Sequence, residues 1–211
     1  MTDIDPLPLD VTPPAAPVIR RTRPKRGERR IQILHALAEM LEQPGGERVT
    51  TAALAARLDV SEAALYRHFA SKAQMFEGLI EFIEQSVFEL VSQIESQVGL
   101  TGSVKAASMV TLLIKFAEKN RGMTRVMVGD ALVLEHERLQ LRMNLFFDKL
   151  EAALKQFLRA DTSGSSTPTV DVQVRASVLM AFTRGRLQRF ARSGFKRLAS
   201  DHLSACLALV L

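Results

Sequence analysis

The chain has 211 residues, of which 47% are apolar and 24% charged, so it is long enough for one large domain or two small ones with a buried core. It contains no apolar run of the ~18–20 residues that cross a bilayer, no N-terminal secretory pattern and a single cysteine, Cys206, which excludes an internal disulfide. The net charge of +5 and these exclusions predict a cytoplasmic globular protein with an anionic partner.

The first 30 residues differ from the rest in proline content and charge. Six of the eight prolines fall within the first 24 residues, which predicts a disordered leader. Residues 20–30 hold seven cations against one anion, Glu28, and form a basic arm. Such blocks often bind the phosphates of nucleic acids or anionic membranes, although a solubilising tail has the same composition. We assign residues 1–27 to this leader and arm.

Helical spacing begins near Glu28 and continues to Leu41, where Pro44-Gly45-Gly46 predicts a stop. Thr50 is placed to cap a second, short helix. Ser61 is placed to cap a third that extends to about Phe69, with Asp59 at the turn between them. Ser71-Lys72-Ala73-Gln74 has the form of a capping box and predicts the start of a long fourth helix.

The rest of the chain also reads as helical. After a break at residues 97–103, a helix is predicted to about Lys119, ended by Asn120-Arg121-Gly122. Further helices are predicted at 123–128, 131–159, 170–192 and 199–211, with a polar loop at 161–169. Strand alternation is lacking. We therefore predict an all-α protein of about nine helices, with a helix-turn-helix domain at 28–73 and a helical domain at 74–211 for dimerisation and partner binding.

The segment from Thr50 to Phe69 fits a helix-turn-helix. Alanines supply the small side chains that two crossing helices need, and Asp59 stands where the turn requires left-handed geometry. The outward face of the second helix of this pair would carry Ser61, Ala64, Arg67 and His68, with Tyr66 at its edge. A helix of this kind fits the major groove of DNA.

The stretch "TTAALAARLDVSEAALYRHFASKAQMFEGLIEFIEQS", with its Tyr-x-x-Phe-x-x-Lys ending, resembles the DNA-binding domain of the TetR family. The later stretches "FAEKNRGMTRVMVGDALVLEHERLQLRMNLFF" and "RLQRFARSGFK" are similar to a branch of that family that acts in nucleoid occlusion. The resemblance covers roughly residues 28–198. Asp59, Ala70 and Lys119 depart from the family pattern, which has glycine, proline and arginine there.

The resemblance implies a nucleoid-associated homodimer that binds palindromic double-stranded DNA, with one or more dimers per site. It also implies binding of the division GTPase FtsZ and antagonism of FtsZ assembly. The DNA-facing positions that it implies are Thr50, Thr51, Ser61, Ala63, Ala64, Tyr66, Arg67, His68 and Lys72. Arg67 is the expected base reader, while Tyr66 and Lys72 would contact phosphate. For Tyr66 a half-buried core position is the alternative, and for His68 a solvated helix face.

The partner positions that the resemblance implies for an FtsZ tail peptide are Phe82, Leu112, Lys115, Lys119 and Asn120. An apolar groove rimmed by cations suits a short peptide with hydrophobic and acidic residues. The alternative is that Phe82 and Leu112 are core residues and the lysines a solvated rim. Dimerisation is expected on the last two helices, 170–192 and 199–211.

Enzymatic chemistry finds no support in the sequence. The four histidines are scattered, no cysteine cluster is available for a metal, and no glycine-rich phosphate loop occurs. We therefore expect no catalytic residue, no metal and no cofactor. Two other functions remain open: a TetR-type repressor that responds to a small apolar ligand, and a helical scaffold whose basic arm contacts anionic lipid.

Overall fold

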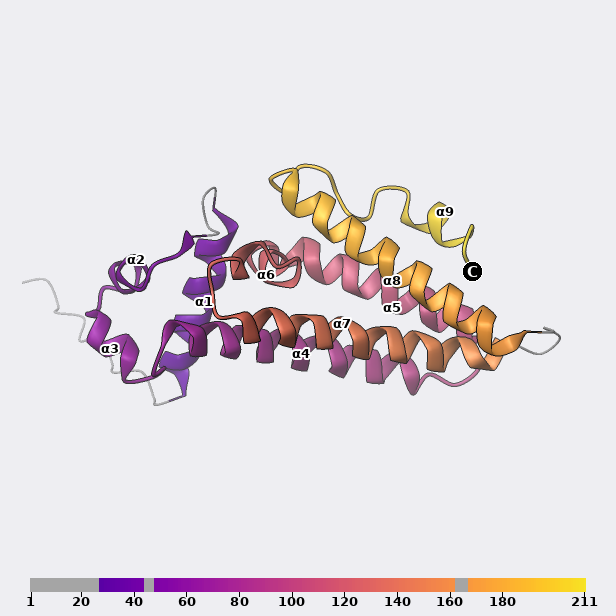
Figure 1. Cartoon of the computed structure of the whole chain (residues 1–211), viewed down its shortest axis with the longest axis horizontal. Helices are drawn as coiled ribbons and strands as arrows, with labels where there is room; N and C mark the ends of the chain where they lie inside the picture. Colours follow the sequence, from indigo (N-terminus) through magenta and orange to yellow (C-terminus); the bar gives the residue numbers. More distant parts are fainter. Residues whose placement is uncertain (1–26, 44–47, 162–166) are drawn as a thin grey trace, which may run out of the picture.

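The computed structural model describes residues 27–43, 48–161 and 167–211, and in these residues the regular structure is entirely helical (Figure 1). Nine α-helices occur in the described part of the chain, which confirms the all-α prediction. The predictions for the leader and arm up to residue 26, for the Pro44-Gly45-Gly46 stop and for most of the polar loop lie outside the described residues.

Three helices form the N-terminal end of the molecule: α1 (Glu28–Glu42), α2 (Thr51–Arg57) and α3 (Glu62–Tyr66). Thr50 and Ser61 cap α2 and α3 as predicted, because their hydroxyl oxygens accept hydrogen bonds from the amides of Ala53 and Ala64 at 3.2 and 3.3 Å. Asp59 has φ of 53°, so the left-handed turn is also confirmed.

The predicted end of the third helix at Phe69 is wrong. The amides of His68 and Phe69 both donate to the carbonyl of Leu65, at 2.9 and 3.1 Å, and this tight turn closes α3 at Tyr66. The turn carries the Phe69 ring into the core, where it is fully buried. Arg67 and His68 therefore follow the helix instead of lying within it.

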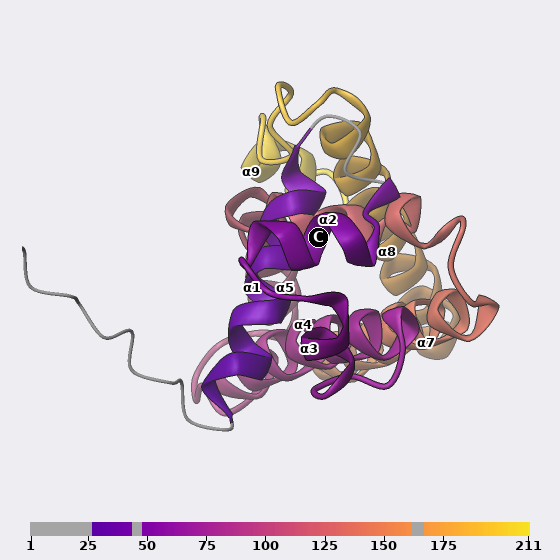
Figure 2. The same ribbon diagram turned by 90° about the vertical axis from the view of Figure 1, so that its left-hand side faces the viewer.

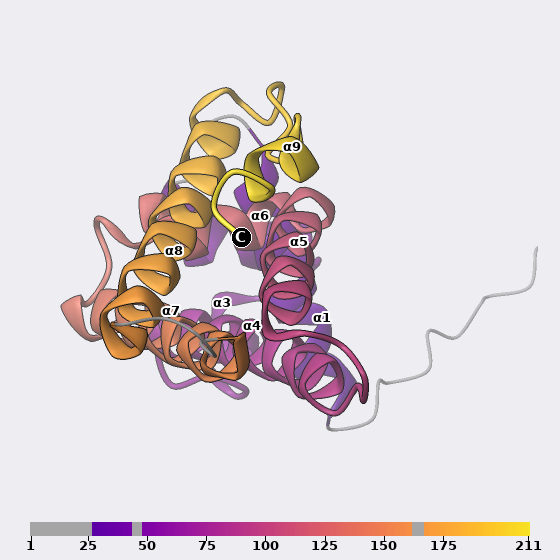
Figure 3. The same ribbon diagram turned by 90° about the vertical axis from the view of Figure 1, so that its right-hand side faces the viewer.

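Four long helices make up the body: α4 (Lys72–Glu95), α5 (Gly102–Lys119), α7 (Glu137–Leu158) and α8 (Pro168–Arg192). They run along the long axis of the molecule, with α1–α3 at one end (Figures 1 and 2). In the end-on view, α4 and α5 lie on one side, and α7 and α8 on the other (Figure 3). Buried apolar side chains of all these helices form one core.

The predicted helix stop at Asn120-Arg121-Gly122 is only partly correct. α5 ends at Lys119, but α6 (Arg121–Met127) begins at once and contains Gly122. A Cβ on Gly122 would lie 1.9 Å from the carbonyl oxygen of Ala38 on α1. Gly122 is thus needed because α6 packs closely on α1, and it does not end a helix. The sequence alone does not show this, because Ala38 is far from Gly122 along the chain.

Two other predicted helix starts also need correction. Gly129 has φ of 88°, and the segment after it forms a short 3-10 turn (Asp130–Leu132), so α7 starts at Glu137 and not near 131. α9 (Leu203–Leu207) is much shorter than the predicted 199–211, because His202 before it has φ of 54°. The residues before α9 bridge α5 and α8: the Ser200 amide donates to Glu118, and Arg186 donates to the carbonyl of Ala199.

Ion pairs join the first half of α4 to the first turns of α7. Arg138 pairs with Glu77 at 2.7 Å, and Arg142 pairs with Glu84 at 2.6 Å. Arg142 donates hydrogen bonds to the Glu84 carboxylate, and these bonds, working against burial, raise the pKa of the Arg142 guanidinium above its ordinary value. These pairs hold the half of α4 that is nearer to α1–α3 against α7.

Candidate DNA and partner interfaces

The outward end of the helix-turn-helix presents small and polar residues around α3. Ala63 and Arg67 are exposed, Tyr66 keeps 44% of its surface exposed, and Ala64 is half-buried. Leu65 and Phe69 anchor the opposite side in the core. The predicted DNA-facing residues of this segment therefore share one end of the molecule (Figure 2).

The three hydroxyl residues in the predicted set also hold the motif together. Thr50 and Ser61 cap the two helices, and Thr51 donates its hydroxyl to the Glu62 carboxylate at 2.6 Å. This last bond ties the start of α2 to the start of α3. The hydroxyl groups of these residues thus have a structural role. Arg67, by contrast, places a long cationic side chain at the end of α3.

Arg67 caps the C-terminal end of α3 and is exposed. His68 beside it is half-buried, and its carbonyl accepts a hydrogen bond from the Arg30 guanidinium at 3.3 Å. Arg30 also lies 4.2 Å above the centre of the Phe69 ring. One cation of the basic arm is therefore part of the fold and fixes the turn that carries Arg67.

Lys72 lies at the start of α4, and its ammonium pairs with the Glu135 carboxylate from the segment before α7. The same ammonium lies 5.7 Å from the centre of the Phe76 ring. This pairing was not foreseen from the sequence, because the two residues are 63 positions apart. A phosphate contact by Lys72 would have to compete with Glu135.

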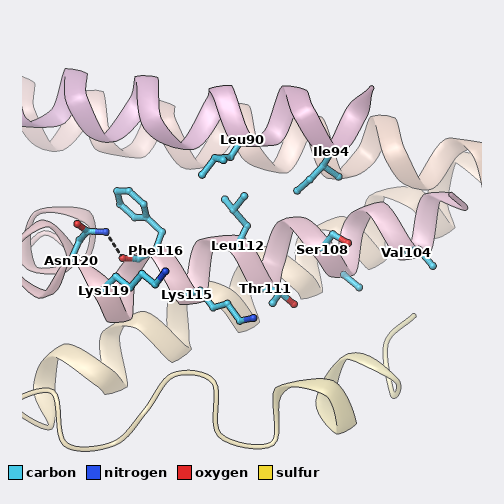
Figure 4. Close-up of a pocket in the computed structure, with 11 residues that line it drawn as sticks. Leu90, Ile94, Val104, Ser108, Thr111, Leu112, Lys115, Phe116, Lys119 and Asn120 are labelled. Carbon is cyan, nitrogen blue, oxygen red and sulfur yellow. Dashed lines mark hydrogen bonds between the residues drawn. The ribbon is translucent and has the colours of Figure 1, made fainter. Parts of the chain in front are cut away.

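A groove of about 590 Å³ runs between α4 and α5 (Figure 4). Leu112, Lys115, Lys119 and Asn120, four of the five predicted partner residues, line it together. The other lining residues were not predicted from the sequence; they are Leu90, Ile94, Val104, Ala107, Ser108, Thr111 and Phe116. A signal was present, since the lining positions of α5 recur at helical i, i+3 and i+4 spacing.

The floor of this groove is apolar, whereas one of its edges carries positive charge. Leu90 and Ile94 of α4 face Leu112 across an apolar floor, and Lys115 and Lys119 stand at the edge formed by α5 (Figure 4). Both lysines are exposed, and neither pairs with a carboxylate in the part of the chain that the structure describes. The groove therefore offers apolar contact beside unneutralised positive charge.

Phe82, the fifth predicted residue, is 43% exposed on α4 but does not line the groove. It lies eight residues before Leu90, about 12 Å nearer to the start of α4 and about 80° around the helix from it. Phe82 is thus not the core residue that the alternative interpretation required.

The start of α5 is held by Asp161, which follows the end of α7. Its carboxylate accepts the Gly102 amide at 2.8 Å and the Ser103 hydroxyl at 2.7 Å. Burial opposes ionisation, but these hydrogen bonds, the Ser103 amide and the charge of Arg175 together lower the pKa of Asp161. The wall of the groove is thereby tied to α7.

A second apolar surface lies on the opposite side of the body. Exposed Leu141 and Leu145 on α7, and exposed Val170, Val174 and Val178 on α8, recur every four residues, which places each set on one stripe of its helix. A Cβ on Gly185, further along α8, would meet no atom. We call this surface the α7–α8 face.

The described residues contain no helix that is both long and apolar enough to cross a membrane. Histidine, cysteine and acidic side chains in the same ranges do not gather in any group of three that could bind a metal ion.

Two family descriptions match the chain. Residues 33–79 match the bacterial regulatory proteins of the tetR family, and residues 101–210 match the tetracyclin repressor-like C-terminal domain of the SlmA-like type. The nucleoid occlusion factor SlmA of Idiomarina loihiensis is 48% identical over 86% of this chain and 92% of its own length. That of Vibrio cholerae is 46% identical over 88% of this chain and 95% of its own.

Solved structures support the fold alone. The fatty acid degradation regulator FadR from Bacillus halodurans superimposes with a TM-score of 0.70 at 15% identity, over 90% of this chain and 96% of that chain. The ketosteroid regulator KstR2 of Mycobacterium tuberculosis has a TM-score of 0.65 at 21% identity, over 86% of this chain and 92% of its own. The chain is a non-enzymatic, DNA-binding member of the TetR family and belongs to the group of the SlmA nucleoid occlusion factors.

Proposed function

We propose that this chain is a nucleoid occlusion factor that binds palindromic chromosomal sites and, when bound, antagonises assembly of FtsZ. In this proposal residues 28–73 bind DNA, and residues 74–211 dimerise and bind FtsZ. The observation that carries it is the apolar, lysine-edged groove in a chain 46–49% identical to nucleoid occlusion factors. Its place of action would be the nucleoid.

DNA recognition would use the end of α3. The exposed Arg67 guanidinium can make two parallel hydrogen bonds to guanine, and Tyr66 and the helix caps would fix the register on the phosphates. In a two-fold symmetric dimer, the two copies of α3 would enter half-sites about one helical turn, or a multiple of it, apart.

The α7–α8 face is the surface that we propose for the homodimer. Its valines and leucines are exposed in one chain, whereas helices of a second copy would bury them in a four-helix bundle. The sequence predicted a dimer interface on residues 170–192 and 199–211. The proposed face keeps α8 but uses α7 in place of the short α9. α4 and α5, which line the proposed FtsZ groove, lie on the other side of the body from α7 and α8 (Figure 3), so such a dimer would leave the groove open.

The groove would take the C-terminal tail of FtsZ. Apolar side chains of the tail would lie against Leu90, Ile94 and Leu112, and its acidic groups would face Lys115 and Lys119. DNA binding would bring the protein to the nucleoid and, through the shared dimer, favour the state that acts on FtsZ.

Capture of purified FtsZ on the immobilised protein, with and without palindromic DNA, tests the proposal. We expect capture that increases with DNA and that a synthetic FtsZ tail peptide prevents. Absence of binding to FtsZ and to the peptide in both conditions would contradict the proposal. It would leave a TetR-type repressor that responds to a small ligand as the function.

A further inference from the structure

We infer that the groove between α4 and α5 has an internal ligand: residues 3–11 of the same chain dock in it and compete with the partner peptide. This inference rests on the proposed function of the groove and adds a means of its regulation. It combines the lining of the groove with the composition of a segment that precedes the described residues.

The leader has the composition that the groove selects. Residues 3–11 read "DIDPLPLDV", with three aspartates interleaved with Ile4, Leu7, Leu9 and Val11. Residues 1–19 contain no lysine or arginine, so this end of the chain is acidic although the following arm is strongly basic.

The groove complements this segment in polarity and in charge. Its floor offers Leu90, Ile94 and Leu112 to apolar side chains, and the free ammonium groups of Lys115 and Lys119 face the solvent at its edge. Aspartates that alternate with apolar residues would meet those two lysines while the apolar residues fill the floor. The basic arm itself, with seven cations in residues 20–30, would be repelled by the same edge.

The leader is long enough to reach the groove. α1 begins at Glu28 on the side of the body that carries α4 and α5, away from the α7–α8 face (Figures 2 and 3). The sixteen residues from Val11 to Gly27 span at most about 55 Å when extended. The whole of α4 is about 36 Å long, so the groove of the same chain is within range.

A tethered segment acts as a competitor at high local concentration. At an effective concentration on the order of 1 mM, a segment with a dissociation constant of about 0.1 mM fills its groove about 90% of the time. A partner peptide would then bind about tenfold more weakly than to an empty groove.

Two measurements on the full chain test this inference. The first compares binding of a labelled FtsZ tail peptide to the native chain and to a variant with Leu7→Ser and Leu9→Ser. Ala15→Ser with Ala16→Ser, in the same leader but outside the docking segment, is the matched control. We expect the leucine variant to bind the tail peptide about tenfold more tightly and the alanine variant to match the native chain.

The second measurement adds a synthetic peptide of residues 1–12 to the leucine variant, with and without Lys119→Glu. We expect the peptide to bind, and Lys119→Glu to remove most of that binding. Equal affinity of the native chain and the leucine variant for the tail peptide, or no binding of the leader peptide, would overturn the inference. Failure of the tail peptide to bind any variant would instead refute the proposed function. In that case, binding of the leader peptide that is lost with Lys119→Glu would still identify residues 3–11 as a ligand of the groove.

Discussion

The body of this protein has two exposed apolar surfaces that differ in shape and in charge. The α7–α8 face presents stripes of valine and leucine on two adjacent long helices, with open space at Gly185. The surface between α4 and α5 is a groove edged by Lys115 and Lys119, which pair with no carboxylate among the residues that the structure describes. In a two-fold dimer the same patch of each copy meets its counterpart, so apolar stripes on a helical face suit a second copy of the chain. A groove edged by positive charge suits a peptide with acidic residues.

The largest effect is expected when the α7–α8 face is broken. Val174→Glu places a charge in the centre of the proposed four-helix bundle, where it would be desolvated without a partner. We expect a monomer, and a loss of affinity for palindromic DNA of about 100-fold or more because binding by two linked half-sites is lost. Light scattering and gel shifts measure the two effects.

Val98→Glu is the control for that substitution, since Val98 is 98% exposed in the loop before α5. The same chemical change there should leave the dimer and the DNA affinity intact. A Val174→Glu chain that remains dimeric would move the dimer interface away from α8.

Arg67→Ala tests DNA recognition without changing either apolar surface. If the guanidinium makes a bidentate contact with guanine, we expect a loss of about 1–3 kcal/mol on specific DNA. Affinity for random DNA and for the FtsZ tail peptide should change little. Equal weakening on specific and random sequences would show a phosphate contact in place of base reading.

Lys119→Glu tests the charge of the groove. In the chain with Leu7→Ser and Leu9→Ser, where the leader does not compete, the reversed charge should weaken binding of the FtsZ tail peptide about tenfold, which corresponds to about 1.4 kcal/mol, while DNA binding stays intact. Lys196→Glu, the same reversal at an exposed position after the end of α8, is the control. Unchanged antagonism of FtsZ polymers by the Lys119→Glu chain would exclude Lys119 from the partner site.

The smallest effect is expected at Asp161, which ties the wall of the groove to α7. Its folded-state pKa is lowered, so its contribution to stability is present above the unfolded value near 3.8 and is lost as the pH falls through the folded value. Asp161→Asn should cost about 1 kcal/mol at neutral pH and make the acid side of the stability profile shallower. Urea unfolding at several pH values measures this, and an unchanged profile would mean that the carboxylate does not stabilise α5.

Local chemistry was predictable from the sequence and distant contacts were not. Thr50, Ser61 and Ser71 cap the helices that their positions predicted, because capping depends on the next three residues only. Gly122 was misread as a stop, because the backbone of Ala38 that it touches is 84 residues earlier. The pairing of Lys72 with Glu135 was invisible for the same reason.

In the candidate partner groove, too, residues on one helix were predicted and residues brought in by a second helix were not. Leu112, Lys115, Lys119 and Asn120 were expected together from the resemblance to the family, and they lie together because one helix and its end carry them all. Leu90 and Ile94 were missed because they join the groove only when α4 packs beside α5. Phe82 was expected in the groove and lies outside its lining, since helical spacing fixes its side of α4 but not where along α4 the two helices separate.

The most direct test of the central claim is to locate the FtsZ tail peptide on the molecule by chemical-shift changes in the isotopically labelled, DNA-bound dimer. Apart from the displaced leader, we predict shifts confined to α4 near Leu90 and Ile94 and to α5 from Val104 to Asn120, with the α7–α8 face unchanged. Shifts on the α7–α8 face, or none at a saturating concentration of the peptide, would contradict the account.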